Sequence, residues 1–237
     1  MIEYIFATRY SETRNKYMLV YKEVLVAPSL ANKFEHYTYS PDGTVTTNDI
    51  LAIGIWNTTH GSLESRTEDF LKGTYKGVYY EQVGASVWLR LTKIDTVSVF
   101  DGTISKFRFN KAISGKLVIA RSINPNIFSV DGLSAIKTDN AEFNRQLTIF
   151  SSQGHEAFYI LTPHFMECIL KLYNGYPRMM IIVFEHDTMT ILRSGAKMCE
   201  FSEAKKVDFF EARAKIIGEM QNMLDIVDTL NIGNTEK

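Results

Sequence analysis

The stretch TYKGVYYEQVGASVWLRLTKIDTVSVFDGTISKFRFNKAISGKLVIA, residues 74–120, decides the fold class of this chain. It is rich in β-branched and aromatic residues, and short polar or glycine-containing interruptions divide it, which is typical of successive β-strands. We expect the first two strands to form a hairpin around Gly84, and a turn at Asp101-Gly102 to separate two later ones. The expected strands cover residues 74–83, 86–94, 98–100, 104–110 and 115–120, the last being a central strand.

The sequence that follows continues the same pattern. Residues 142–150 (EFNRQLTIF) indicate a further strand. Residues 178–185 and 188–194 are apolar and flank His186-Asp187, which indicates a compact hairpin. The chain is therefore predicted to have an antiparallel sheet core over residues 74–194.

A helical region is expected ahead of the sheet, in residues 1–56. Ser11 is a suitable N-cap for a helix over residues 12–27, where apolar side chains recur at helical spacing. The other elements expected before the sheet are a short helical turn at 29–34, a turn at 39–44, a short helix at 48–56 and a polar loop at 58–69.

Residues 151–175 (SSQGHEAFYILTPHFMECILKLYNG) predict two consecutive helices. Ser152 is a suitable N-cap for the first, which is short. Thr162-Pro163 is the N-cap and first-turn pattern of the second. The second helix is expected over residues 163–174, ended by Gly175 and packed on the sheet.

Two side chains of this second helix raise the question of a metal site. His164 and Cys168 are four residues apart and lie on adjacent turns, but two ligands do not make a site and no second pair is visible. Cys168 also belongs to the apolar side of the helix, where a free cysteine behaves as a small hydrophobic residue. We therefore predict no metal and no cofactor.

The C-terminal part of the chain predicts one long helix over residues 203–231, with Ser202 as its N-cap. Its apolar arc covers about half of the circumference. Two interpretations stay open: the helix packs in a groove of its own domain, or part of the arc meets another subunit or partner. The residues assigned to the buried face are Phe210, Ile217, Met220, Leu224 and Val227.

Composition limits the classes of protein to consider. The 237 residues are 45% hydrophobic and 22% charged, with a net charge of −1, which fits a single α+β domain over residues 1–237. There is no basic excess, so nucleic acid is not a strong candidate ligand. The two cysteines are typical of a reducing cytoplasm. The sequence has no run of 18 apolar residues, so we expect no transmembrane segment.

Motifs for catalysis are absent from the sequence: it has no nucleophile elbow, Walker loop, zinc-protease motif or dinucleotide fingerprint. Two groups of residues are candidates for binding. Glu68 and Asp69 form an acidic pair whose alternative interpretation is a solvated pair beside a strand. Lys106, Arg108 and Lys111 form a basic strip that alternates with Phe107 and Phe109, as at surfaces that bind anions or single-stranded nucleic acid. The same alternation is also expected of a strand with one buried face.

Many short motifs, in a consistent order, resemble one family. They are Glu68-Asp69, Lys72-Gly73, Phe100-Asp101-Gly102, Phe109-Asn110-Lys111, Gly115, Glu142-Phe143-Asn144, Glu156-Ala157, Leu161-Thr162-Pro163, Phe165-Met166-Glu167 and the segment LDIVDTLNI at 224–232. Through them, residues 21–232 resemble the bacterial proteins grouped as domain of unknown function number 3137. The resemblance implies no established activity. Many members carry hydrophobic segments ahead of this region, and this sequence departs from that pattern.

These observations favour a non-enzymatic binding or protein-interaction module of the bacterial cytoplasm, with an unknown protein as its partner. Two alternatives are an enzyme with an unrecognised active site and an oligomeric structural protein that associates through the C-terminal helix. An enzyme predicts a deep pocket with converging polar groups. A binding module predicts an exposed apolar patch, groove or sheet edge.

Overall fold

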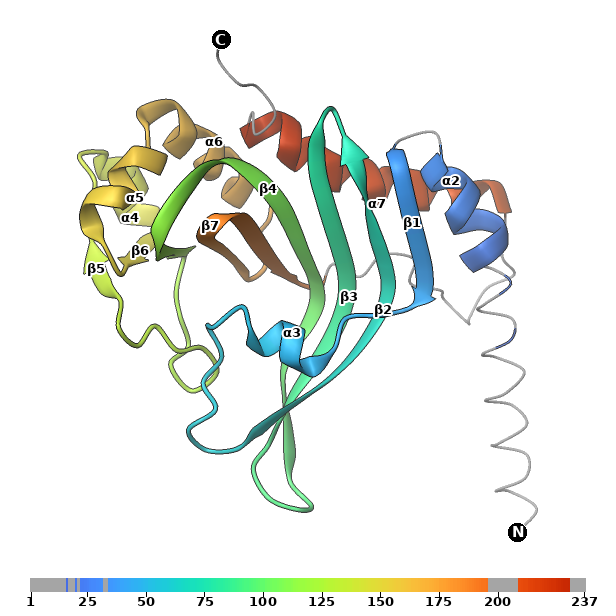
Figure 1. Cartoon of the computed structure of the whole chain (residues 1–237), viewed down its shortest axis with the longest axis horizontal. Helices are drawn as coiled ribbons and strands as arrows, with labels where there is room; N and C mark the ends of the chain where they lie inside the picture. The colour runs from blue at the N-terminus through green and yellow to red at the C-terminus, as the bar shows by residue number, and fades with distance from the viewer. Residues whose placement is uncertain (1–15, 17–19, 21, 32–33, 196–208, 231–237) are drawn as a thin grey trace.

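A curved antiparallel sheet organises the protein, and the computed structural model describes residues 16, 20, 22–31, 34–195 and 209–230 (Figure 1). The strands are β1 (Glu35–Asp42), β2 (Ser62–Tyr75), β3 (Val78–Arg90), β4 (Thr96–Ala120), β5 (Ser134–Ile136), β6 (Thr148–Ser151) and β7 (Met180–Ser194). Their order is β1-β2-β3-β4-β6-β5, with β7 paired to β4, and every pairing is antiparallel. The predicted α+β class is confirmed.

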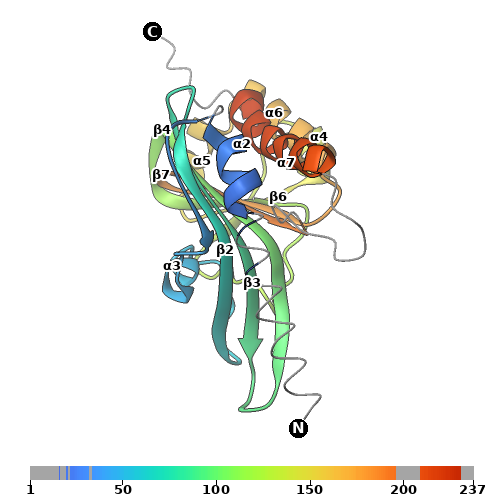
Figure 2. The same cartoon turned by 90° about the vertical axis from the view of Figure 1, so that its right-hand side faces the viewer.

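Helices cover both faces of the sheet. They are the π-helical turn η1 (Lys22–Val26), α2 (Ala27–Ala31), α3 (Thr47–Leu51), α4 (Ala141–Gln146), α5 (Gly154–Ile160), α6 (Pro163–Asn174) and α7 (Phe209–Leu230). α2, α6 and α7 lie on one face and α3 lies on the other (Figure 2). Two hydrophobic clusters correspond to these faces, one beneath α6 and α7 and one beneath α3.

β4 is the central strand, because it pairs with β3, β6 and β7 along different parts of its length. Residues 96–107 pair with β3, and residues 117–120 pair with β6. β7 pairs with β4 from Gly102 to Ala120, with register shifts between Arg108 and Lys116. These shifts mark the bend that gives β4 the form of an arch in Figure 1.

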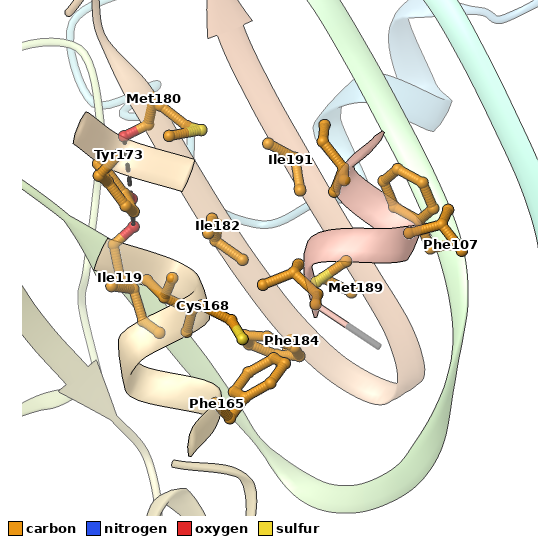
Figure 3. Packing of buried hydrophobic residues seen from close by; sticks show 14 of the residues in the cluster. Phe107, Ile119, Phe165, Cys168, Tyr173, Met180, Ile182, Phe184, Met189 and Ile191 are labelled. Atoms are coloured by element: carbon orange, nitrogen blue, oxygen red, sulfur yellow. Dashed lines mark hydrogen bonds between the residues drawn. The ribbon is translucent and has the colours of Figure 1, made fainter. Parts of the chain in front are cut away.

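β7 follows the arch of β4 and bends back on itself. The bend lies at His186, whose φ of 53° is in the left-handed region. The backbone N–H of Ser194 donates to the carbonyl oxygen of Met179 at 3.0 Å, so the two ends of the strand meet. Figure 3 shows the two legs of β7 side by side. The hairpin predicted around His186-Asp187 is thus present as one bent strand.

The two-residue period of the strands divides their apolar side chains between the clusters. The side chains that face α6 and α7 include Phe107, Ile119, Ile182 and Ile191 (Figure 3). Those that face α3 include Ile104, Val118, Val183 and Leu192. Because both faces are covered, residues 117–120 of β4 and 180–184 of β7 are continuous apolar runs, which is why 115–120 was recognisable as a central strand.

α6 confirms the helix predicted at 163–174. The side chain of Thr162 accepts a hydrogen bond from the backbone N–H of Phe165, and Pro163 begins the helix. Cys168 is 4% exposed, as the apolar stripe predicted. The hydroxyl of Tyr173 donates to the carbonyl oxygen of Ile119 at 2.6 Å and lies 3.2 Å from that of Met180, which joins the helix to β4 and β7 (Figure 3).

The sheet begins earlier than predicted. β1 occupies residues predicted as a turn at 39–44, and β2 occupies most of the loop predicted at 58–69. Most side chains in the first half of β2 are polar and at least partly exposed, and Leu63 is its buried apolar residue. Its strand conformation comes from pairing with β3, from Ser62 opposite Arg90 onward. Because this part of β2 is a strand through pairing with β3 and not through burial of one face, its sequence shows no alternation of hydrophobic and polar residues.

The predicted turns were wrong in two places. The hairpin between β2 and β3 turns at Lys76-Gly77, where both φ angles are positive, and Gly84 lies inside β3. Asp101-Gly102 lies inside β4. A Cβ at Gly102 would come within 2.0 Å of the carbonyl oxygen of Arg193, so glycine here permits close approach of β7.

Two further predictions were wrong in part, one of a strand and one of the buried face of a helix. Residues 142–150 were predicted as a strand, but α4 occupies the first part, with the Asn140 side chain accepting from the N–H of Phe143, and β6 occupies the second.

In α7, Met220, Leu224 and Val227 are buried as predicted, but Phe210 is 88% exposed. The buried residues described in α7 begin at Ile216, because the first turns lie beyond the hydrophobic cluster. The predicted helix over 12–27 and residues 203–208 lie largely outside the described residues.

Candidate binding groove

α3 has a local cap at its start and a contact with the sheet beyond its end. A capping box forms its start: the N–H of Asp49 donates to Oγ1 of Thr46 at 3.3 Å, and the N–H of Thr46 donates to Oδ2 of Asp49 at 2.8 Å. The hydroxyl of Thr46 also donates to Oδ2 of Asp49 at 2.6 Å, and the two bonds that this carboxylate accepts hold the pKa of Asp49 below its ordinary value. Beyond the end of the helix, Nζ of Lys116 on β4 donates to the carbonyl oxygen of Ile53 at 3.0 Å.

Two hollows lie between the α3 segment and the sheet, and both are lined by Ile53 and Lys106. We call them together the α3 groove. The larger hollow has a volume of about 170 Å³ and the smaller about 20 Å³. The apolar part of the lining includes Ile50, Ile53, Val83, Ile104 and Val183. The polar part includes Asp49, Glu81, Lys106, Glu185, Thr188 and Thr190.

Lys106 has the central position in the α3 groove. It follows Ile104 on the α3 face of β4 and borders both hollows. Among the described residues, no carboxylate lies within ion-pair distance of its Nζ atom. Glu185, across the larger hollow, is paired with Lys116 at 3.2 Å. The groove therefore combines an apolar floor with one available cation and several hydrogen-bonding groups.

The other members of the predicted basic strip are not brought together with Lys106. Arg108 pairs with Asp187 on β7, with 2.5 Å between Nη1 and Oδ2. Lys111 lies within the bend of β4, where Nζ donates to the carbonyl oxygen of Tyr159 at 3.2 Å and lies 5.1 Å from the centre of its ring. Phe107 is buried beneath α7. The structure thus brings Lys106 alone of the three into a groove.

The predicted acidic pair lies at a bulge in β2, and it is not a solvated pair. Asp69 has a φ of 54° and is 1% exposed. Its carboxylate lies 3.0 Å from Nζ of Lys22 and accepts from the hydroxyl of Tyr39 at 2.5 Å, and Glu68 lies 3.6 Å from the same Nζ. Burial raises the pKa of Asp69, although Lys22 and Tyr39 oppose this. The bulge turns the Asp69 side chain inward, which strand alternation alone could not predict.

Comparison with known proteins agrees with the family resemblance. A family model described as "Protein of unknown function (DUF3137)" matches residues 98–232. This chain belongs to the DUF3137 family. No curated protein matches it. A crystal structure of the mycobacterial trehalose monomycolate transport factor A, TtfA, is similar over 82% of this chain and 88% of that one, with a TM-score of 0.40 and 8% identity.

Several groove residues of this DUF3137 protein were missed by sequence reasoning. Glu185, His186, Thr188 and Thr190 were interpreted only as parts of a hairpin. Their shared site follows from the bend in β7, for which the sequence offers only the polar His186-Asp187 pair within an apolar run. Asp49 was not singled out either, although a threonine three residues before an aspartate resembles a capping box.

The part of the chain that the structure describes has neither a cluster of metal ligands nor a helix that could cross a membrane. No group of three His, Cys, Asp or Glu side chains there is placed to hold a metal ion. His164 is exposed, and its Nε2 atom lies 3.7 Å from Sγ of Cys168. None of the helices described is both long enough and apolar enough to cross a membrane.

Proposed function

We propose that this DUF3137 protein is a non-enzymatic binding module that receives a segment of a partner protein in the α3 groove. The observation that carries the proposal is that Ile53 and Lys106 line two adjacent hollows, which together have an apolar floor and a polar rim. Interfaces commonly combine an apolar centre with a polar border. An acidic or carbonyl group of the partner would pair with Lys106, while a neighbouring side chain enters the larger hollow, packs on Ile53 and Val183 and meets its polar rim.

The size of the hollows supports a partner side chain over an enclosed substrate. Pockets that enclose small molecules typically measure about 300–1,000 Å³. The larger hollow, at about 170 Å³, is below that range and suits one or two side chains of a polypeptide. Two of the acidic groups that line the groove already have structural partners, Asp49 in the cap of α3 and Glu185 with Lys116.

Peptide display on the immobilised protein tests this proposal. We expect the wild-type protein to select peptides that combine an acidic residue with an apolar one. Lys106→Glu should lose these peptides through charge repulsion. Lys93→Glu makes the same charge change in the exposed turn after β3 and is the matched control. Equal selection by all three proteins, each with a native melting transition, would refute the proposal.

One observation favours an enzyme as the second candidate. His186 lines the larger hollow with a left-handed φ of 53°, and strained backbone conformations concentrate at functional sites. In that case His186 would transfer a proton and Thr188 or Thr190 would orient the substrate. A screen of hydrolase and transferase substrates tests this candidate, since His186→Ala should abolish any activity found and Lys93→Glu should keep it.

The third candidate, a structural oligomer formed through α7, depends on the exposed start of that helix. Met220, Leu224 and Val227 are already used in the core of the chain itself. Only the first described turns, with Phe210 exposed, remain for a second copy. Measuring the mass of the protein in solution tests this candidate independently of the groove proposal, because the exposed start of α7 and the α3 groove share no residues.

A further inference from the structure

A buried arginine lies on the face of the sheet opposite the α3 groove. Arg193 in β7 is 6% exposed, and its partner residue across the ladder is Thr103 in β4, which is 1% exposed. Directly paired residues of antiparallel strands project from the same face. The neighbouring residues of that face, Met189 and Ile191, belong to the cluster beneath α6 and α7 (Figure 3). Arg193 and Thr103 therefore project together toward the helix layer.

The polar atoms of this pair lack partners. Within the described part of the chain, the buried side-chain nitrogens and oxygens without a hydrogen bond are Nε of Arg193 and Oγ1 of Thr103. Buried polar groups are nearly always hydrogen-bonded, and a buried charge without a counter-ion is strongly unfavourable. Because these two groups lie on directly paired residues, a single bound acceptor group would satisfy both.

The surroundings of Arg193 supply no anion from the described residues. The ring of Tyr176 lies 5.7 Å from Cζ of Arg193, which compensates the charge only partly. Across the ladder, the row of paired residues runs from Arg193 through Thr103 and Gly84 to Glu68 on β2. Glu68 is three strands away, about 14 Å at the usual spacing, and lies beside Lys22. Burial lowers the pKa of Arg193, which agrees with the lack of a counter-ion.

We propose that Arg193 and Thr103 form an internal binding site for an oxyanion, a carboxylate or phosphate group of a ligand. The guanidinium group presents donors in a planar fork that matches two oxygens of such a group, and the hydroxyl of Thr103 adds a further donor. Tyr176 borders the site: its ring lies 5.7 Å from Cζ of Arg193, and its hydroxyl donates to the carbonyl oxygen of Ser194 at 2.6 Å. The site is separate from the α3 groove, so it stands whether or not that groove binds a partner.

Inorganic phosphate and acetate are the probes that test this site. Melting temperature is measured in each anion against chloride at constant ionic strength, and affinity by calorimetry. We expect at least one of the two anions to raise the melting temperature of the wild-type protein through binding to the folded state. Stabilisation by phosphate alone assigns a phosphoryl ligand, and stabilisation by acetate assigns a carboxylate.

Two variants and one control decide where the anion binds. Arg193→Met keeps the volume and should abolish the stabilisation. Thr103→Val removes one hydrogen bond donated to the anion and should weaken the affinity at least about tenfold. Arg90→Met, at an exposed arginine paired with Glu64, should behave as wild type. The proposal is overturned if neither anion stabilises the wild-type protein, or if Arg193→Met is stabilised equally. Should Arg193→Met not fold, unchanged affinity of Thr103→Val overturns it.

Discussion

The ammonium group of Lys22 in η1 lies 3.0 Å from the carboxylate of Asp69 in β2, and both side chains are buried. This ion pair joins the N-terminal helical segment to the sheet across 47 residues of sequence. The hydroxyl of Tyr39 on β1 adds a hydrogen bond to the same carboxylate. Because burial raises the pKa of Asp69 despite both partners, desolvation outweighs their attraction, and the pair specifies geometry at a cost in stability.

Removing the cation of this pair is predicted to make stability strongly dependent on pH. Lys22→Met should lower the free energy of unfolding by about 3 kcal/mol at neutral pH, since it leaves a buried carboxylate without a counter-ion. A carboxyl group with a raised folded-state pKa contributes stability below its ordinary pKa and loses it as pH rises through the raised value. Denaturant titrations between pH 4 and 7 should therefore show a growing loss as pH increases.

The double variant and an exposed control complete that test. Asp69→Asn in the Lys22→Met background should remove the pH dependence and recover most of the stability, because no buried charge remains. Lys76→Met, at an exposed lysine paired with Asp228, should leave stability nearly unchanged. A Lys22→Met protein as stable as wild type at pH 7 would show that the ion pair does not anchor η1.

The two ends of α7 are predicted to respond differently to the same substitution. Leu224→Asp should unfold the protein or lower its melting temperature strongly, because Leu224 is 1% exposed and a buried carboxylate is costly. Phe210→Asp, at a side chain that is 88% exposed, should leave the melting temperature nearly unchanged. Light scattering on the second variant also tests association, since a loss of mass there would assign Phe210 to a subunit interface.

Tyr173→Phe is predicted to cost about 1–2 kcal/mol of stability. The hydroxyl is fully buried between carbonyl oxygens of β4 and β7, and its removal leaves the carbonyl oxygen of Ile119 without this donor. Tyr79→Phe, at a side chain that is 40% exposed, is the control and should change stability little. Equal midpoints for both variants in urea would argue against a role for Tyr173 in joining α6 to the sheet.

The thiol of Cys168 is predicted to react slowly in the native protein. It is 4% exposed, and burial raises its pKa, so little of the reactive thiolate is both formed and accessible. In a Cys199→Ser background, maleimide labelling of the native protein should be far slower than labelling in denaturant. Rapid native labelling would contradict the orientation of α6 and bring back the question of a metal at His164 and Cys168.

Local rules accounted for the elements whose signals lie within a few neighbouring residues. The cap at Thr162-Pro163, the burial of Cys168 and the central strand at 115–120 needed only spacing and side-chain chemistry. The errors fall where a distant strand decides the conformation. β2 is a strand because β3 pairs with it, and Asp101-Gly102 is extended because β7 packs close to Gly102.

The sequence by itself determined the class of this protein, its sheet-forming core and its family, because hydrophobic periodicity, caps and ordered motifs are local properties of the chain. The tertiary structure alone decided which polar residues meet. The bends of β4 and β7 place Lys106 beside Glu185, His186 and the segment after α3, and the β4–β7 register places Arg193 opposite Thr103. The bulge at Asp69 turns a carboxylate inward. Bends, bulges and strand register are fixed by contacts between residues far apart in sequence, so no single stretch of this chain encodes them.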